Sequence, residues 1–217
     1  MIEIEDIFFN KVTKRSDKWH PYFRAYDKHL SKFRNKECRI LEIGVQKGGS
    51  LELWHHYLGD KCSIYGVDND PSVLDLKYDF DVNITVGDQE DPKFWKDYTA
   101  KNGFFDIIID DGGHTMAQQN VTILSLFGKL NYGGIYIVED THTSYWENWG
   151  GGFRSEESFI EKTKSLVDLL HIRHIKNEKP SLNIMNTFNG LSSMTFYDSM
   201  VVFEKEIPME FKRIVNM

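Results

Sequence analysis

The chain has 217 residues, of which 41% are hydrophobic and 27% charged, as is typical of a globular protein. Its net charge of −7 argues against a nucleic-acid-binding surface, which needs an excess of Lys and Arg on one face. No apolar run approaches the roughly 20 residues that span a bilayer, residues 1–10 lack a signal-peptide pattern, and two cysteines are too few for a disulfide framework. We expect a cytoplasmic protein with a small-molecule partner, no nucleic acid and no membrane; a homo-oligomer stays open.

An amphipathic helix is predicted ahead of the first strand. Six apolar residues recur there at helical spacing and form one stripe: Trp19, Tyr22, Phe23, Tyr26, Leu30 and Phe33. The stripe is expected to cover a sheet edge or a ligand crevice. We assign residues 1–38 to a helical cap or lid on an α/β core over residues 39–217, within one domain. Asp17 and His20 either help this lid to close or cap a helix, and the sequence leaves both roles open.

From residue 39 onward, short apolar strands alternate with helical patterns, which is typical of a mostly parallel sheet with helices on both faces. The expected strands cover residues 39–43, 63–67, 84–86, 105–109 and 135–138. Ser50 and Asp91 are expected to cap the helices that follow two of these strands, and Gly59 and Gly103 to end them. Residues 193–206 predict an antiparallel hairpin that closes the sheet. Ligands of such sheets bind outside the carboxyl ends of the strands.

A glycine-rich loop joins the first strand to its helix. Its spacing is Glu42-x-Gly44-x-Gln46-x-Gly48, whereas a dinucleotide site would show G-x-G-x-x-G. Glycines at this place let a ligand approach the backbone closely, although they can also serve only to make tight turns. Asp68, at the end of the second strand, is suited to accept hydrogen bonds from both hydroxyls of a ribose. The two features together predict a nucleoside cofactor.

The loop spacing resembles the first motif of class I S-adenosylmethionine-dependent methyltransferases, in the L-E-I-G-x-x-x-G-x-S variant of several small-molecule O-methyltransferases. The resemblance implies a Rossmann-like fold with a mostly parallel, seven-stranded sheet, and S-adenosylmethionine as cofactor. The residues it assigns to cofactor binding are Glu42, Gly44, Gly48, Ser50, Asp68, Gly87, Asp88, Gln89 and Asp110. A nucleotide-binding oxidoreductase is the competing interpretation, against which the missing last glycine of G-x-G-x-x-G counts.

Acidic clusters follow the fourth and fifth strands, as D-D-G-G-H-T at residues 110–115 and V-E-D-T-H-T-S-Y-W at residues 138–146. Adjacent parallel strands lie about 4.8 Å apart, so carboxylates at the ends of neighbouring strands converge. A divalent cation is the natural counter-charge, and oxygen ligands favour Mg²⁺ or another hard cation over zinc. In the competing interpretation, Asp110 or Asp111 only caps the helix that begins near Thr115.

With the S-D-K-W-H-P-Y and Y-D-K-H elements at residues 16–22 and 26–29, these clusters resemble the metal-dependent sugar O-methyltransferases of macrolide antibiotic biosynthesis. The resemblance implies Asp111, Glu139 and Asp140 as metal ligands and His114 as general base, which makes His114 and Asp111 the expected catalytic residues. The implied reaction transfers a methyl group to a sugar hydroxyl of a glycan or glycosylated metabolite, with Mg²⁺ orienting vicinal hydroxyls.

Residues 145–153 combine four aromatic residues with three glycines, a composition typical of a mobile loop whose rings stack on sugars or anchor the loop. The candidate substrate contacts are His142, Tyr145, Trp146 and Trp149. Residues 174–192 show no clear periodicity. The motifs do not identify the acceptor, so a catechol-like or other small diol is the alternative to a sugar. A non-catalytic binding protein is least favoured, because it has no need for four converging polar ligands.

Overall fold

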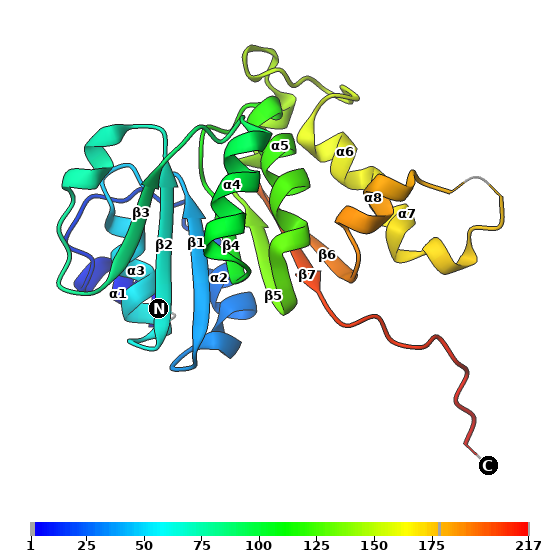
Figure 1. The fold of residues 1–217 in the computed structure, drawn as a ribbon, viewed down its shortest axis with the longest axis horizontal. Coiled ribbons are helices and arrows are strands. Elements are labelled where there is room, and N and C mark those ends of the chain that lie inside the picture. Colours follow the sequence, from blue (N-terminus) through cyan, green and yellow to red (C-terminus); the bar gives the residue numbers. More distant parts are fainter. Residues whose placement is uncertain (1–2, 178, 217) are drawn as a thin grey trace.

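The computed structural model describes residues 3–177 and 179–216, so residues 1, 2, 178 and 217 of the predicted domain lie outside the description. Figure 1 shows a central sheet with helices on both faces. Within the described ranges the sheet has seven strands in the order β3-β2-β1-β4-β5-β7-β6. β3, β2, β1, β4 and β5 pair in parallel, and β7 pairs antiparallel with both β5 and β6. The predicted mostly parallel sheet with a C-terminal antiparallel hairpin is confirmed.

The strands are β1 (Cys38–Ile43), β2 (Cys62–Asp68), β3 (Val82–Val86), β4 (Phe105–Asp110), β5 (Leu130–Val138), β6 (Leu191–Tyr197) and β7 (Met200–Lys205). The α-helices are α1 (Glu3–Asn10), α2 (Tyr22–Leu30), α3 (Gly49–Leu58), α4 (Pro92–Asn102), α5 (Met116–Leu126), α6 (Phe159–Ser165), α7 (Val167–Leu170) and α8 (Leu182–Thr187). In this set, no helix is long and apolar enough to cross a membrane.

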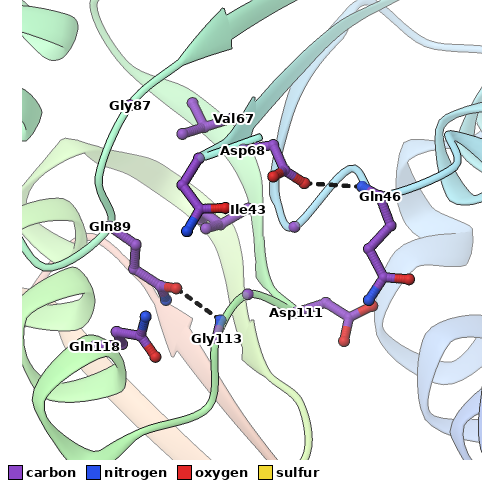
Figure 2. A pocket seen from close by; sticks show the side chains of 12 residues that line it. Ile43, Gln46, Val67, Asp68, Gly87, Gln89, Asp111, Gly113 and Gln118 are labelled. Atoms are coloured by element: carbon purple, nitrogen blue, oxygen red, sulfur yellow. Dashed lines mark hydrogen bonds between the residues drawn. The ribbon is translucent and has the colours of Figure 1, made fainter. Parts of the chain in front are cut away.

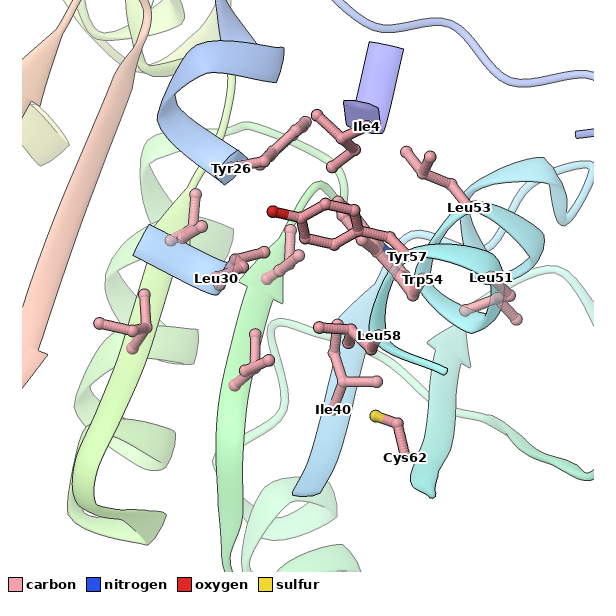
Figure 3. Packing of buried hydrophobic residues seen from close by; sticks show 14 of the residues in the cluster. Ile4, Tyr26, Leu30, Ile40, Leu51, Leu53, Trp54, Tyr57, Leu58 and Cys62 are labelled. Carbon is pink, nitrogen blue, oxygen red and sulfur yellow. The ribbon is translucent and has the colours of Figure 1, made fainter. Parts of the chain in front are cut away.

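Alternate residues of the central strands pack into two hydrophobic cores, one on each face of the sheet. In β4, Ile107 and Ile109 join one core while Ile108 joins the other. The first core lies under α1, α2 and α3, where the buried rings of Tyr26 and Trp54 meet with centroids 5.1 Å apart (Figure 3). The second lies under α4, α5 and α6. Burial of both faces explains why these strands read as nearly continuous apolar runs.

The helix signals in the sequence are partly correct. The Asp91 side chain accepts a hydrogen bond from the Lys93 N–H at the start of α4, and Gly59 and Gly103 follow the ends of α3 and α4, as predicted. The prediction that Ser50 caps α3 is wrong. Gly48 takes the cap position with a left-handed φ of 83°, so the helix begins earlier and Ser50 lies inside its first turn.

The helix α5 is capped by Thr115, whose side chain accepts a hydrogen bond from the Gln118 N–H, while the Gln118 side-chain oxygen accepts one from the Thr115 N–H. This capping box satisfies the first turn without a carboxylate. The interpretation in which Asp110 or Asp111 serves only as the cap of this helix is therefore wrong, and both carboxylates are available for other partners.

The predicted aromatic stripe is correct except at its first member. Tyr22, Phe23, Tyr26 and Leu30 are buried on α2, whereas Trp19 precedes the helix and is 59% exposed. Trp19 belongs to an irregular stretch, residues 11–21 between α1 and α2, which we call the N-terminal segment. The stripe packs on one face of the sheet, in the first core, and only the hydroxyls of Tyr22 and Tyr26 reach the residues that follow β5.

The strand order places a crevice between β1 and β4. From β1 the chain continues to β2 on one side, and from β4 it continues to β5 on the other. The loops that follow β1 and β4 therefore diverge, leaving space outside the carboxyl ends of these strands, where open α/β sheets bind their ligands.

Two glycines with similar positive φ angles differ in how closely other atoms approach them, and this difference tests how tightly the carboxyl ends of the strands are packed. Gly44, directly after β1, has a φ of +93°, and a Cβ there would lie 1.9 Å from the Asp111 carbonyl oxygen. Gly133 has a φ of +84° with no atom within 4 Å of the Cβ position. Alanine in this left-handed region costs about 1–2 kcal/mol at either site. We predict that Gly44→Ala lowers the free energy of unfolding in urea by about 1–3 kcal/mol more than Gly133→Ala, through overpacking. Equal losses would mean that the loop yields freely.

Candidate active site

A cavity of about 170 Å³ opens outside the carboxyl ends of β1, β2 and β4, and we call it the strand-end cavity. Figure 2 shows the side chains around it. Its lining comes from the loops after β1, β2, β3 and β4 and from α5: Ile43, Gly44, Gln46, Val67, Asp68, Asn69, Gly87, Gln89, Asp111, Gly112, Gly113 and Gln118. The cavity therefore lies at the predicted crevice.

Asp68 is held in place by backbone groups on two sides. Its Oδ2 accepts a hydrogen bond from the Gln46 N–H at 2.8 Å, and its Oδ1 accepts one from the Asp70 N–H at 2.9 Å (Figure 2 shows the first). An ionised carboxylate offers about four acceptor positions. Asp68 therefore keeps capacity for two more donors, which is what the two hydroxyls of a ribose supply.

The predicted cofactor-binding residues divide into two groups. Gly44, Asp68, Gly87 and Gln89 border the strand-end cavity. The other five do not border it: Glu42 and Asp110 lie at the ends of β1 and β4, Ser50 in the first turn of α3, and Gly48 and Asp88 in loops.

This second group supports the walls of the cavity. The Ser50 hydroxyl donates to buried Glu42 at 2.8 Å, and Asp88 accepts from the Glu90 N–H at 2.8 Å. Gln89 joins the loops after β3 and β4, because its amide donates to Asp110 at 2.7 Å and its carbonyl oxygen accepts from the Gly113 N–H.

Three side chains of the two acidic clusters meet beside the cavity. Asp111, His114 and Asp140 offer ligand atoms that all lie within 4.8 Å of one another, and we call this group the cation cluster. His114 Nε2 is 3.9 Å from Asp111 Oδ1 and 3.6 Å from Asp140 Oδ2. His114 and Asp140 both have a left-handed backbone, a costly conformation that concentrates at functional sites.

Glu139, the third predicted metal ligand, is not part of the cation cluster. Its side chain is buried, and its two oxygens accept hydrogen bonds from the Tyr26 hydroxyl at 2.5 Å and the Lys18 ammonium at 3.0 Å. The same ammonium lies 2.5 Å from Asp111 Oδ2 and 3.8 Å from Glu42 Oε1, and the Lys18 side chain is only 1% exposed. One buried cation thus bridges carboxylates from β1, β4 and β5.

Burial governs the proton affinity of these groups. It raises the pKa of Glu42 to about 7 and that of Glu139 to about 8, while the charge of Lys18 works in the opposite direction. For Lys18, burial lowers the pKa, but Asp111, Glu139 and Glu42 outweigh it and hold the pKa well above its usual value. The ammonium therefore remains charged at any physiological pH.

His114 is suited to accept a proton. Burial lowers its pKa, although Asp111 and Asp140 act to raise it, so the imidazole is largely neutral near pH 7. Its Nε2 faces the two carboxylates, while its buried Nδ1 has no hydrogen-bond partner among the described residues. The free ring nitrogens leave the residue available to a ligand.

A second cavity, of about 270 Å³, lies on the far side of Asp140 and has mostly aromatic walls. We call it the aromatic pocket, and its lining is Trp19, Pro21, Tyr22, His142, Trp146, Asp198 and Ser199. Trp19 and Tyr22 connect it to the cation cluster, because both donate hydrogen bonds to Asp140 Oδ1, at 3.1 and 2.8 Å.

Two of the four predicted substrate residues, His142 and Trp146, line the aromatic pocket. Tyr145 and Trp149 do not, although the Trp149 ring lies 6.4 Å from that of His114. In the N-terminal segment, Asp17 is exposed and paired with Arg15, and His20 is exposed and paired with Glu5. Neither reaches the site, whereas their neighbours Lys18 and Trp19 do.

Several known proteins are similar to this chain in sequence and in structure. No protein-family model matches the chain. Demethylmacrocin O-methyltransferase of Streptomyces fradiae is 35% identical over 78% of this chain and 46% of its own length. Mycinamicin VI 2''-O-methyltransferase of Micromonospora griseorubida is 33% identical over 91% of this chain and 53% of its own length. The chain is a homologue of the macrolide sugar O-methyltransferases.

The structures agree with this relationship. The MycE methyltransferase of the mycinamycin biosynthetic pathway, solved with Mg and SAH, matches with a TM-score of 0.77 at 27% identity, over 94% of this chain and 54% of that chain. The present methyltransferase homologue therefore has the class I methyltransferase fold. It spans about half the length of the curated relatives that it matches.

The raised pKa of Glu139 makes a prediction about pH. A carboxyl group whose pKa is higher in the folded state than the unfolded value of 4.5 binds more protons when folded, so its contribution to stability falls as pH rises from about 4.5 to about 8. We predict that wild-type protein in EDTA loses stability relative to Glu139→Gln across this window, by up to about 1.4 kcal/mol per pH unit. Urea denaturation at several pH values measures the difference. A difference that stays constant or changes sign would contradict the raised pKa.

Proposed function

We propose that this chain carries an S-adenosylmethionine-dependent O-methyltransferase activity directed at a sugar hydroxyl of a glycan or glycosylated metabolite, assisted by Mg²⁺. S-adenosylmethionine would be held in the strand-end cavity, with Asp68 on its ribose, and Mg²⁺ by the carboxylates of the cation cluster. The proposal extends to residues 1–217 as one unit in which the N-terminal part, residues 1–38, covers the site. It is supported by relatives named demethylmacrocin O-methyltransferase and mycinamicin VI 2''-O-methyltransferase, and by the fold shared with MycE.

One observation carries the proposal: Asp111 belongs to both sites. It lines the strand-end cavity and it is a member of the cation cluster. A methyl donor in the cavity and a cation-bound oxygen would therefore meet on either side of one carboxylate. Transfer of a methyl group needs this proximity, because the attacking oxygen must lie about 3–3.5 Å from the methyl carbon.

The residues of the chain divide the chemical work. His114 takes the proton of the acceptor hydroxyl at Nε2, the nitrogen that faces the cluster. Asp111 and Asp140 supply ligand oxygens, and the Lys18 ammonium places a positive charge beside Asp111 and Glu139. When bound, S-adenosylmethionine provides an electrophilic methyl group and Mg²⁺ lowers the pKa of the hydroxyl that it contacts.

The aromatic pocket is proposed to receive the acceptor. It lies next to Asp140, which accepts hydrogen bonds from Trp19 and Tyr22 of its lining. It offers the rings of Trp19 and Trp146, whose flat apolar faces suit the C–H faces of a sugar ring. Asp198 and Ser199 add polar groups for hydroxyls. The same rings would also accept a flat diphenol, so a catechol-like acceptor is the second candidate.

We predict that calorimetry detects S-adenosylmethionine binding to the full chain, and that release of S-adenosylhomocysteine in the presence of Mg²⁺ follows addition of glycosides from an acceptor panel. His114→Ala should lower kcat about 10²–10⁴-fold, the usual contribution of a general base, without changing cofactor affinity. EDTA should abolish turnover.

His56→Ala is the matched control, because His56 is exposed on α3, and it should leave kcat unchanged. Absence of cofactor binding would refute the proposed class. Undiminished turnover in EDTA or in His114→Ala would refute the metal-and-base mechanism alone, and methylation of diphenols but not glycosides would select the second acceptor.

A further inference from the structure

Each carboxylate of the cation cluster is held through one of its two oxygens by the start of the chain. Asp111 Oδ2 accepts from the Lys18 ammonium at 2.5 Å. Asp140 Oδ1 accepts from the Trp19 indole N–H at 3.1 Å and from the Tyr22 hydroxyl at 2.8 Å. All three donors lie between residues 18 and 22, whereas the acceptors follow β4 and β5, more than ninety residues later.

The other oxygen of each carboxylate faces His114. Asp111 Oδ1 lies 3.9 Å and Asp140 Oδ2 lies 3.6 Å from His114 Nε2. A carboxylate that is fixed at one oxygen cannot turn freely about its side-chain bonds. Its second oxygen is therefore presented in one direction, which in both cases is the centre of the cation cluster.

We propose that Lys18, Trp19 and Tyr22 are positioning residues of the cation site, which orient Asp111 and Asp140 for a divalent ion. This inference rests on the proposed function, since it assigns a role toward the Mg²⁺ of that mechanism. Partners behind the ligands of a metal fix the ligand geometry and govern affinity. Here those partners come from the N-terminal segment and the first residue of α2.

The segment that carries these donors is itself anchored. The backbone N–H groups of Thr13 and Lys14 both donate to Glu52 Oε2, at 2.7 and 2.9 Å, on α3. Gly49 makes room for this contact, because a Cβ there would lie 2.4 Å from the Lys14 carbonyl oxygen. Two fixed ends, at Glu52 and at α2, keep the donors in place between them.

The neutral donors give the clean test, because replacing Lys18 would change the charge of the site as well as its geometry. Mg²⁺ affinity is measured by calorimetry, and Mn²⁺ affinity by electron paramagnetic resonance, for wild type, Trp19→Phe, Tyr22→Phe and the double variant. We expect each single variant to bind the ion about 10-fold more weakly and the double variant up to about 100-fold more weakly. Trp146→Phe is the matched control, since its ring lies in the same pocket but makes no bond to Asp140, and its Mg²⁺ affinity should equal that of wild type.

Thermal denaturation in EDTA separates positioning from folding. A purely structural role of Trp19 and Tyr22 would lower Tm and leave the dissociation constant of Mg²⁺ unchanged in the folded variants, and this result would overturn the inference while the proposed function stood. Failure of the wild-type chain to bind Mg²⁺ or Mn²⁺ would overturn the metal-assisted function and the inference together. Weaker ion binding by the double variant at an unchanged Tm supports it.

Discussion

The Lys18 ammonium lies among three carboxylates that come from three different strands. Glu42 belongs to β1, Asp111 follows β4 and Glu139 follows β5. Burial disfavours the ionised forms of Glu42 and Glu139 and raises the pKa of both carboxyl groups. Removing an ion from water costs several kcal/mol even after relaxation, and clustered like charges add repulsion. The ammonium acts against both effects at once. It therefore helps the carboxyl ends of the three central strands to hold acidic side chains side by side.

This arrangement links the two halves of the site. Glu42 lies behind the cofactor loop, where the Ser50 hydroxyl fixes its second oxygen, and Asp111 borders both the strand-end cavity and the cation cluster. A displacement of Lys18 would remove a positive charge that lowers the pKa of both Glu42 and Glu139, so burial would favour their neutral forms further. The strand that precedes the glycine-rich loop and the acidic clusters, although they are proposed to serve different ligands, are thus parts of one electrostatic unit.

Sequence signals predicted the sheet and the location of the site because those signals are local. Apolar runs that end in glycine or acidic residues marked the strands, and the placement of D-D-G-G-H and V-E-D after neighbouring strands placed Asp111, His114 and Asp140 together. Lys18 was missed because its contacts join residues 93 and 121 positions apart, and a lysine in a polar stretch reads as solvated. The prediction that Ser50 caps α3 failed for a related reason. The Ser50 hydroxyl donates to buried Glu42, a partner that helix-capping patterns do not represent.

The predicted boundary at residue 38 places Asp111 and Asp140 in the α/β core and their hydrogen-bond donors Lys18, Trp19 and Tyr22 in the cap. The cap is no removable lid, because it supplies the cation of the buried cluster and the donors on Asp140. Trp19 and Tyr22 moreover have two sets of contacts. Both line the aromatic pocket, and both donate a hydrogen bond to Asp140. An acceptor that shifts these rings must also shift a ligand of the cation cluster. In the proposed function, the shape of the acceptor and the geometry of the cation site would therefore be physically coupled, so that a substitution at these rings would alter both.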